Sequence, residues 1–213
     1  SSAASDVYKR QPLHHHLLKA KLADLLPTQA SIGFHEVEKK RLEWRKLSKK
    51  QFKEVINQHW FPSILGPEGC HYIIDHHHLG MALHLEGQKH VFLTVLKDLS
   101  WLDQESFWKV MEFYQWVHPY DHQGRRIAFE KLPSQISDLK DDPYRSLAGL
   151  IRDHGAYAKE LTPFNEFLWA DFLRMRIKPA TLKANIEASI KLACELARSQ
   201  EASYLPGWID SKS

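Results

Sequence analysis

Strand-like and helix-like patterns are segregated along this chain of 213 residues. Residues 90–96, HVFLTVL, are rich in β-branched and aromatic residues, a composition typical of strands. Residues 181–199 instead repeat apolar side chains at the spacing of a helical turn, with Leu182, Ile186 and Ile190 on one stripe. Strands in the first half and helices in the second predict the α+β class, in which a helical region follows a sheet module.

Short strands and helices are expected to alternate in the first half. Ser48 followed by Gln51 is a capping-box pattern, which predicts the start of a helix. The turn sequence GPEG at residues 66–69 separates two apolar runs that could pair as a hairpin. Gly87 can end the helix LGMALHLEG. The expected helices are 35–46, 49–59 and 76–86, and the expected strands are 61–65, 70–74 and 90–96, with a short strand or turn at 30–34.

The second half is expected to be helical and packed on the sheet module. The predicted helices are 100–117, 143–154, 164–177 and 181–199. No Gly/Ser/Pro-rich linker separates Leu96 from Trp101, so we divide the chain into a module at 12–100 and an extension at 101–213 that is not freely tethered. The side chains expected to share a core with the sheet are Trp101, Phe107, Phe164, Phe167 and Leu168.

Composition places the chain among ordinary globular proteins, with 43% apolar and 26% charged residues. No run approaches the roughly 20 apolar residues of a membrane span. The formal net charge of +3 is too small to indicate nucleic-acid binding by itself. The two cysteines, Cys70 and Cys194, make no disulfide framework, so no disulfide-linked partner is expected and a reducing cytoplasm is the default compartment.

The first residues do not look native. The sequence DVYKRQ is what translation of a transposon-end sequencing adapter gives, so we interpret residues 1–11 as an artefact joined to an incomplete bacterial gene from a metagenome. The true N-terminus would then be missing, and a signal peptide stays an open question. His14, His15 and His16 beside this junction are expected to be a solvated segment rather than a metal site.

The stretch Asp75-His76-His77-His78 is the strongest candidate site. With a strand ending at Ile74, Asp75 is positioned to cap the next helix while the histidines fill its first turn. Free N–H groups and the helix dipole there favour a phosphate, and histidine can act as general acid or base. Three successive helical histidines diverge by about 100° and cannot converge on one metal ion, although Asp75 could bind one. Alternatively, Asp75 is only a cap and the histidines form local hydrogen bonds.

A basic run is the second candidate feature. Residues 39–53 contain eight lysines and arginines and a single acid, Glu43. Such a run could bind nucleic acid or nucleotide phosphate. A pair of solvated helices explains the same pattern equally well.

Other polar groups have structural explanations. Asp141 and Asp142 before Pro143 are typical of a helix start, with metal binding as the less favoured alternative. Glu166 and Asp171 lie among apolar residues, which predicts that their carboxylates are paired or hydrogen-bonded. His118, Asp121 and His122 are expected to cluster in an exposed turn. Cys70 is expected to be a buried, inert thiol.

The pattern I-D-x-H-H-x-x-x-A-L at residues 74–83 resembles the strand-to-helix turn of the ParB/sulfiredoxin superfamily, whose usual form is close to D-G-H-H-R-x-x-A. Further motifs make the resemblance more specific, because together they are similar to the family of ParB-like nucleases over residues 20–178. These motifs are PTQ, HEVEKK, LGPEG, DLSWL, DDPYRSLAG, YAK and PFNEFLWADFLR.

The resemblance implies a small mixed sheet with helices, followed by an all-helical extension packed on it. It implies that the turn binds nucleotide or nucleic-acid phosphate, with His76, His77 and His78 as catalytic candidates. The candidates for holding the phosphate or ligand are Asp75, Lys39 and Gln29. Two positions depart from the superfamily form: His76 replaces its glycine, and Leu79 replaces its phosphate-holding arginine.

The resemblance leaves three functions to separate. The leading hypothesis is a nuclease-like hydrolase that acts on phosphoester bonds at the Asp75–His78 turn, with a divalent metal ion or a nucleotide as a conceivable cofactor. The first alternative is a nucleotide-dependent phosphotransferase similar to the free-serine kinases of the superfamily. The second is a non-catalytic module that binds nucleic acid or nucleotide.

Overall fold

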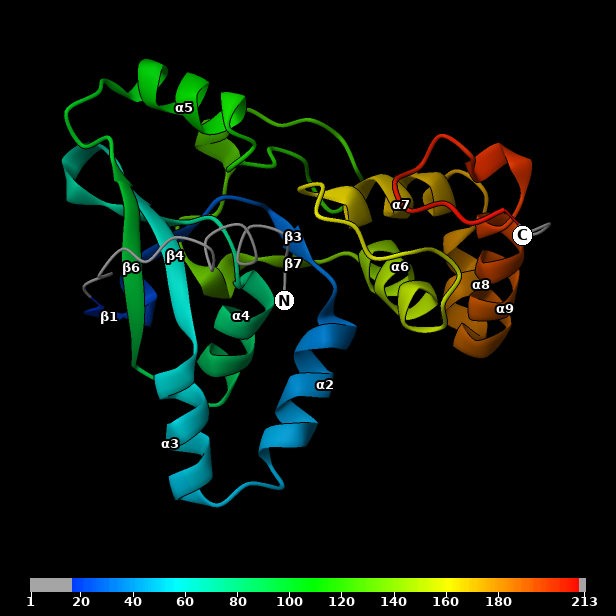
Figure 1. Cartoon of the computed structure of the whole chain (residues 1–213), viewed down its shortest axis with the longest axis horizontal. Helices are drawn as coiled ribbons and strands as arrows, with labels where there is room; N and C mark the ends of the chain where they lie inside the picture. The colour runs from blue at the N-terminus through cyan, green and yellow to red at the C-terminus, as the bar shows by residue number, and fades with distance from the viewer. Residues whose placement is uncertain (1–16, 211–213) are drawn as a thin grey trace.

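The computed structural model describes residues 17–210 (Figure 1). Its strands include β1 (Leu18–Lys21), β2 (Leu25–Pro27), β4 (Trp60–Leu65), β5 (His71–Ile73) and β6 (His90–Asp98). They form one sheet in the order β1-β6-β4-β5-β2. The pairs β4–β6 and β2–β5 are parallel, whereas β1–β6 and β4–β5 are antiparallel. The expected hairpin and the small mixed sheet are therefore confirmed.

The central strand β4 buries both of its faces. Successive side chains of a strand alternate between the two sides of the sheet. Phe61 lies in a core with α4 (His77–Leu85) on one side. Ile64 lies in a second core with α5 (Gln104–Phe113) on the other side. Helices thus cover the sheet on both faces.

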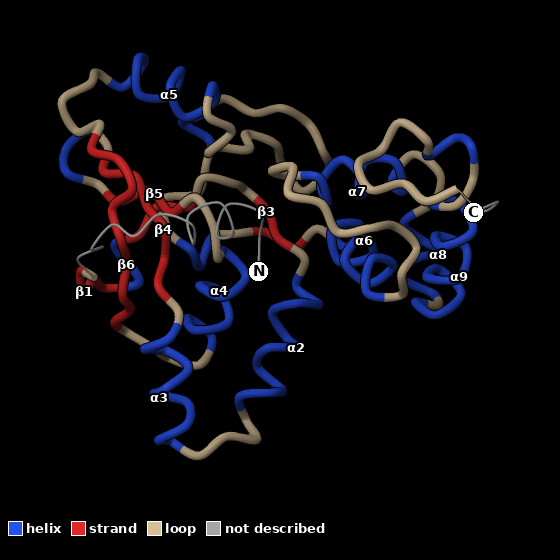
Figure 2. The backbone as a smooth tube through the Cα atoms, viewed as in Figure 1, coloured by secondary structure: helices blue, strands red, loops and turns tan. Residues whose placement is uncertain are grey.

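Two further helices, α2 (Phe34–Trp44) and α3 (Lys49–Gln58), extend the first core (Figure 2). Val37 and Ile56 are their buried contributions to it. The capping box predicted at the start of α3 is confirmed: the Ser48 hydroxyl accepts the Gln51 N–H, and the Gln51 side chain accepts the Ser48 N–H. The sequence located this helix because a capping box is a local signal.

A small second sheet connects the two halves of the chain. The strands β3 (Ser31–Ile32) and β7 (Lys140–Asp141) pair in parallel. The expectation that the second half contains helices alone is therefore wrong for β7, since a two-residue strand is too short to show a period of two. Just before β7, Ile136 and Leu139 join the core that contains α4.

The C-terminal helices form their own core, in which Trp169 and Phe172 are fully buried. The helices are α6 (Pro143–Asp153), α7 (Asn165–Arg174), α8 (Pro179–Ala184) and α9 (Ile186–Ala197). The single helix expected at 181–199 is wrong, because Asn185 has an extended backbone and caps α9 by accepting the Ala188 N–H. The apolar stripe continues across this break, so the periodicity concealed it.

The core predicted to join the extension to the sheet is only partly correct. Phe107 is fully buried and contacts the Tyr72 ring of β5, and Phe167 is 8% exposed. Trp101 is 77% exposed in the turn after β6, and Leu168 is 43% exposed on the outer side of α7. Apolar character alone did not show which face of each segment points inward.

Within residues 17–210, none of the helices has the length and apolar character that crossing a membrane requires. Cys70 and Cys194 are both free thiols. The suspected adapter at 1–11 and His14, His15 and His16 lie outside the described residues.

Candidate functional site

The turn between β5 and α4 has a left-handed residue at its centre. His76 precedes the first helical residue with φ 65° and ψ 23°. The Asp75 Oδ1 atom accepts the N–H of His76 at 2.6 Å rather than an N–H of the helix. The prediction that Asp75 is the N-cap is therefore wrong; His76 occupies that position. Glycine adopts this left-handed conformation without steric cost, which accounts for the glycine of the superfamily turn.

The three histidine rings contact three different backbone segments. His76 Nδ1 donates to the Trp60 carbonyl at 3.0 Å, and His77 Nε2 accepts the Thr28 N–H at 3.1 Å. His78 Nε2 accepts the Gly33 N–H at 3.2 Å. The divergence expected of successive helical residues is thus observed.

Burial keeps these rings neutral. It lowers the pKa of His76 below its usual value, the pKa of His77 to about 3 and the pKa of His78 to about 4. The carboxylate of Glu36, whose Oε2 lies 3.5 Å from His78 Nε2, acts in the opposite direction on His78. Because Nε2 is the acceptor in His77 and His78, the proton of each neutral ring is on Nδ1.

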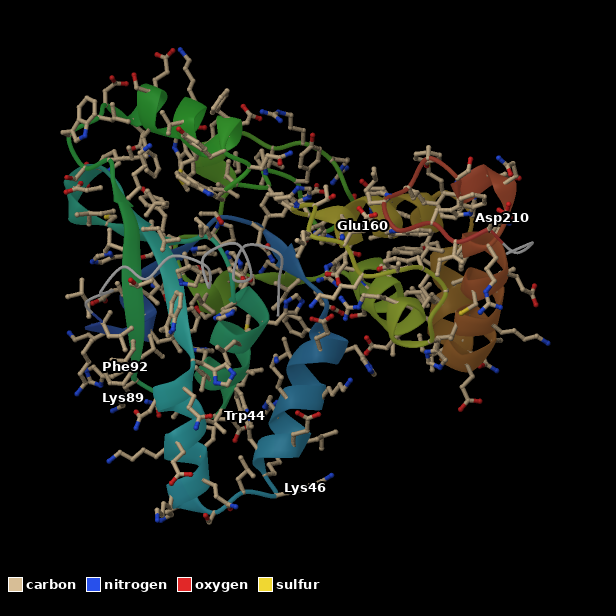
Figure 3. All side chains as sticks on the ribbon, in the orientation of Figure 1. Trp44, Lys46, Lys89, Phe92, Glu160 and Asp210 are labelled. Atoms are coloured by element: carbon tan, nitrogen blue, oxygen red, sulfur yellow. The ribbon has the colours of Figure 1, made fainter. Side chains whose placement is uncertain are left out.

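A cavity of about 480 Å³ lies against this turn. Asp75, His77 and His78 line it from the sheet module, and Arg145 and Arg152 line it from α6. The rest of its wall comes from Gln29 and Ile74, from residues 114–116 after α5, and from residues 159–167 before and within α7. Figure 3 labels Glu160, one of the lining residues, beside the N-terminal end of α7. The site is therefore shared between the sheet module and the helical extension.

Two arginines and two glutamates form a cluster beside the turn. Arg145 and Arg152 both bind the Glu166 carboxylate. Glu36 Oε1 lies 3.6 Å from Arg145 Nη1 and 3.7 Å from Arg152 Nη2. Burial raises the pKa of Glu36, but the interaction with His78, which is protonated at the low pH where Glu36 titrates, and that with Arg145 outweigh burial and lower this pKa to about 2. Glu166 is thus paired, as the sequence predicted.

Several buried polar atoms of the site lack hydrogen-bond partners within residues 17–210. They are Asp75 Oδ2, Glu36 Oε1, and Nε and Nη1 of Arg145. Asp75 is 7% exposed and Arg145 is 6% exposed, so bulk water does not readily satisfy these atoms. Buried polar groups in folded proteins are nearly always hydrogen-bonded. Asp75 and Arg145 line the cavity, and such atoms beside a cavity are typical of a site that a polar ligand completes.

Of the other predicted ligand contacts, Gln29 lies in the site and Lys39 does not. Gln29 is 6% exposed, lines the cavity and donates from Nε2 to the Ser31 carbonyl. Lys39 is exposed and pairs with Asp153 at 3.3 Å. In the part of the chain that the structure describes, no three His, Cys, Asp or Glu side chains are grouped closely enough to hold a metal ion.

Sequence reasoning missed Arg145 and Arg152. These residues are seven positions apart on α6, which places them on one face of the helix two turns apart. A pair of arginines on one face of an otherwise apolar helix was the signal that could have identified them. Asp142 caps this helix by accepting the Tyr144 and Arg145 N–H groups, as predicted.

His118 was expected in an exposed turn, and this expectation is wrong. Its ring stacks on Phe167, with ring centroids 4.2 Å apart, and also on Tyr120 and Phe164. Burial lowers the pKa of His118 to about 3. His118 is not among the cavity-lining residues, although its neighbours Phe164 and Phe167 are.

The fold and the site define an α+β protein in which a His-rich strand-to-helix turn faces a cavity closed by a helical extension. The model of the family described as "Putative ParB-like nuclease" matches residues 18–175, and the chain belongs to this family. It is similar to the crystal structure of protein Atu1540 from Agrobacterium tumefaciens, with 42% sequence identity and a TM-score of 0.86 over 92% of this chain and 97% of that chain. No curated protein matches the chain.

Proposed function

We propose that the protein is a nuclease-like hydrolase that cleaves a phosphoester bond in this cavity. The observation that carries the proposal is the position of Arg145. Arg145 is 6% exposed and lines the cavity that Asp75 and His78 also line. Two of its nitrogen atoms, Nε and Nη1, lack hydrogen-bond partners in the described chain, although Nη1 lies 3.6 Å from Glu36 Oε1. Arginine in such a setting is well suited to donating a charge-assisted hydrogen bond to a phosphate.

Arg145 replaces the phosphate-holding arginine of the superfamily turn in this proposal. Leu79, which occupies that position in the sequence, is 5% exposed and packs in the core under α4. It cannot contact a ligand in the cavity. The positive charge at the site comes instead from α6, which brings Arg145 and Arg152 to the same cavity.

His78 is the proposed group for proton transfer. It lines the cavity as a neutral ring, and a phosphate bound between it and Arg145 would raise its pKa toward neutrality. In the proposed hydrolysis, water forms a new P–O bond, the old P–O bond breaks, and the proton of the water reaches the leaving oxygen through the site. Asp75 Oδ2 is placed to accept a hydrogen bond from that water. His76 and His77 hold the turn in place through the Trp60 carbonyl and the Thr28 N–H rather than transfer the proton.

No step of this proposal runs through a metal ion. The residues around Asp75 do not form a set of three protein ligands in the described chain. Asp75 thus serves here as an acceptor for a hydrogen bond.

The size of the cavity favours a small substrate unit. A volume of about 480 Å³ is within the range of sites for drug-sized ligands. One nucleotide unit fits this range, and the aromatic rings of Trp116 and Phe164 in the wall can contact a base. We therefore propose a nucleic-acid strand as the substrate, with a single nucleotide unit in the cavity.

Turnover of two substrates tests the proposal. The protein should hydrolyse bis(p-nitrophenyl) phosphate and a fluorescently labelled single-stranded oligonucleotide. Arg145→Met and His78→Gln should each lower both rates at least about 100-fold, as removal of a charge-stabilising or proton-transfer group does. His84→Gln, an exposed residue of the same helix α4, is the matched control and should retain activity.

The alternatives predict different products. A phosphotransferase would consume ATP in the presence of serine and leave the diester intact. A binding module would retain the oligonucleotide without forming any product. Either result would replace the hydrolase proposal.

A further inference from the structure

Positive charge is concentrated in α2, α3 and the turn between them. Residues 34–59 contain eight lysines and arginines against four glutamates, a net charge of +4. The whole chain has a net charge of +3, so all of the other residues together sum to −1. The small net charge of the whole chain therefore includes one strongly basic segment, formed by α2 and α3.

The corner between these helices is exposed and is not neutralised. Lys46, Lys49, Lys50 and Lys53 are exposed, and none of them forms an ion pair with another residue in the range 17–210. Arg41, nearer the middle of α2, is by contrast paired with Glu38 and Glu86 at 2.7 Å each. Four exposed lysines without ion-pair partners at one corner indicate a surface that can bind an anionic partner.

Local packing fixes the geometry of this corner. The Trp44 ring at the end of α2 contacts the Phe52 ring of α3, with centroids 5.4 Å apart. The capping box between Ser48 and Gln51 holds the start of α3. The lysines therefore project from a defined turn rather than from a loose loop. Figure 3 shows Lys46 at this corner, well away from Glu160 at the cavity.

Basic residues continue from the corner toward the site. Lys39 pairs with Asp153, which also binds the cavity residue Arg152. Lys40 is close enough that its charge lowers the pKa values of Glu36 and His78. The 11 residues of α2 span about 16 Å at 1.5 Å per residue. A helix of this length can run beside several successive phosphates of a strand.

We propose that the α2–α3 corner is a docking surface for the phosphate backbone of a nucleic-acid strand whose cleaved unit lies in the cavity. This inference rests on the proposed function, which places one unit of the strand in the cavity. The α2–α3 corner then contacts the part of the strand that lies outside the cavity. A membrane surface fits less well. Leu42, at 54%, is the one large apolar side chain that is exposed between residues 34 and 59, whereas membrane-surface helices present a broad apolar face.

Charge reversal at the corner tests the surface. The variant Lys46→Glu, Lys49→Glu, Lys50→Glu is compared with a matched variant, Lys178→Glu, Lys183→Glu, Lys191→Glu, which makes the same charge change at exposed lysines around α8 and α9. Fluorescence anisotropy measures the binding of a labelled 30-nucleotide single strand over a series of salt concentrations. Circular dichroism melts check that both variants remain folded.

The corner variant should bind the strand at least about 10-fold more weakly. Its slope of log K against log salt concentration should fall by up to about 2, since each phosphate contact contributes roughly 0.7 for a single strand. The α8–α9 variant should bind like the wild type. Equal weakening in the two variants, unchanged binding in the corner variant, or no strand binding by the wild type would overturn the proposal. Binding to phosphatidylserine vesicles in place of the strand would do so as well.

A small substrate separates this inference from the proposed function. Bis(p-nitrophenyl) phosphate reaches the cavity without contacting the corner, so the corner variant should hydrolyse it at the wild-type rate. If the wild type binds the strand through the corner but hydrolyses neither substrate, the docking surface stands and the hydrolase proposal fails. If the small diester is hydrolysed and the corner variant binds the strand normally, the hydrolase proposal stands and the docking surface fails.

Discussion

His77 connects the start of α4 to the end of β2, and this contact gives it a mainly structural role. Its ring is 3% exposed, and its Nε2 accepts the N–H of Thr28, the residue after β2. His78 also accepts a backbone N–H, from Gly33, but it additionally lies near the charged cluster of Glu36 and Arg145. The two adjacent histidines are therefore expected to respond differently to substitution.

His77→Ala should destabilise the fold by about 1–3 kcal/mol, because it leaves the buried Thr28 N–H without an acceptor. A cavity at the removed ring adds to this cost. Urea unfolding measures the change. The control His84→Ala removes an exposed histidine from the same helix and should change the stability by less than about 0.5 kcal/mol. A His77→Ala protein with wild-type stability and no activity would instead place His77 in the catalytic machinery.

At position 76 the backbone and the side chain favour different residues. The φ of 65° favours glycine, whereas the His76 ring packs edge-on against Phe61 and donates to the Trp60 carbonyl. His76→Gly loses the ring contacts but relieves the left-handed strain, and His76→Ala loses the contacts and keeps the strain. The glycine variant should therefore be more stable than the alanine variant by about 1 kcal/mol in thermal melts. The opposite order would show that the turn changes conformation when the ring is removed.

Elements with local signals were predicted from the sequence, and elements defined by distant partners were not. The capping box at Ser48 and the cap of α6 at Asp142 involve residues within three positions of each other, so the pattern contains the whole interaction. The strand β7 exists because it pairs with β3, more than a hundred residues away. The left-handed His76 depends on the surrounding packing in the same way. Such features have no counterpart in the local sequence.

The break between α8 and α9 gives a test at the level of an element. Asn185→Ala removes the side-chain acceptor of the Ala188 N–H and should cost about 0.5–2 kcal/mol in urea unfolding. Asn185→Asp keeps an acceptor at the start of a helix and should cost little. If Asn185→Ala were as stable as the wild type, the two helices could join into the single helix that the periodicity predicts.

The site exists only in the intact chain, because its parts come from both halves. The turn at 75–78 is in the sheet module, whereas Arg145 and Arg152 are on α6. Ile136 and Leu139 also complete the core beneath α4. The sequence identified the turn and the basic run, but the cavity depends on long-range packing that no local pattern encodes. The division of the chain near residue 100 stays a prediction.

A fragment of residues 17–98 should consequently not fold by itself. It retains the five strands of the large sheet but lacks α5, which covers one face, and β7, the partner of β3. We expect it to unfold without a cooperative transition and to bind a hydrophobic dye. Limited proteolysis of the full chain should release no stable fragment of this size. Recovery of a folded 17–98 fragment would show that the sheet module is an independent domain.

As the pH is lowered, the free energy of unfolding of the whole molecule should begin to decrease at a higher pH than the titration of carboxylates explains. Burial lowers the pKa values of His77 and His118 to about 3, that of His78 to about 4, and that of His76 below its usual value of 6.5. Between these values and 6.5 the unfolded chain binds protons that the folded chain does not. The free energy of unfolding therefore decreases as the pH falls through this window. Glu36, with its pKa lowered to about 2, contributes the same sign of change only below about pH 4.5.

Urea unfolding at pH 7.5, 6.0 and 5.0 should show this loss before the carboxylates titrate. Each buried histidine contributes up to about 1.4 kcal/mol per pH unit below 6.5. His118→Phe provides the matched comparison, because phenylalanine can stack between Phe164 and Phe167 but cannot be protonated. The free energy of unfolding of this variant should decline less steeply as the pH falls, with a slope smaller by up to about 1.4 kcal/mol per pH unit. At pH 7.5 its free energy of unfolding should differ little from that of the wild type. A stability that stays constant down to pH 4.5 would mean that the histidines become protonated without unfolding, which requires that water reaches them in the folded state.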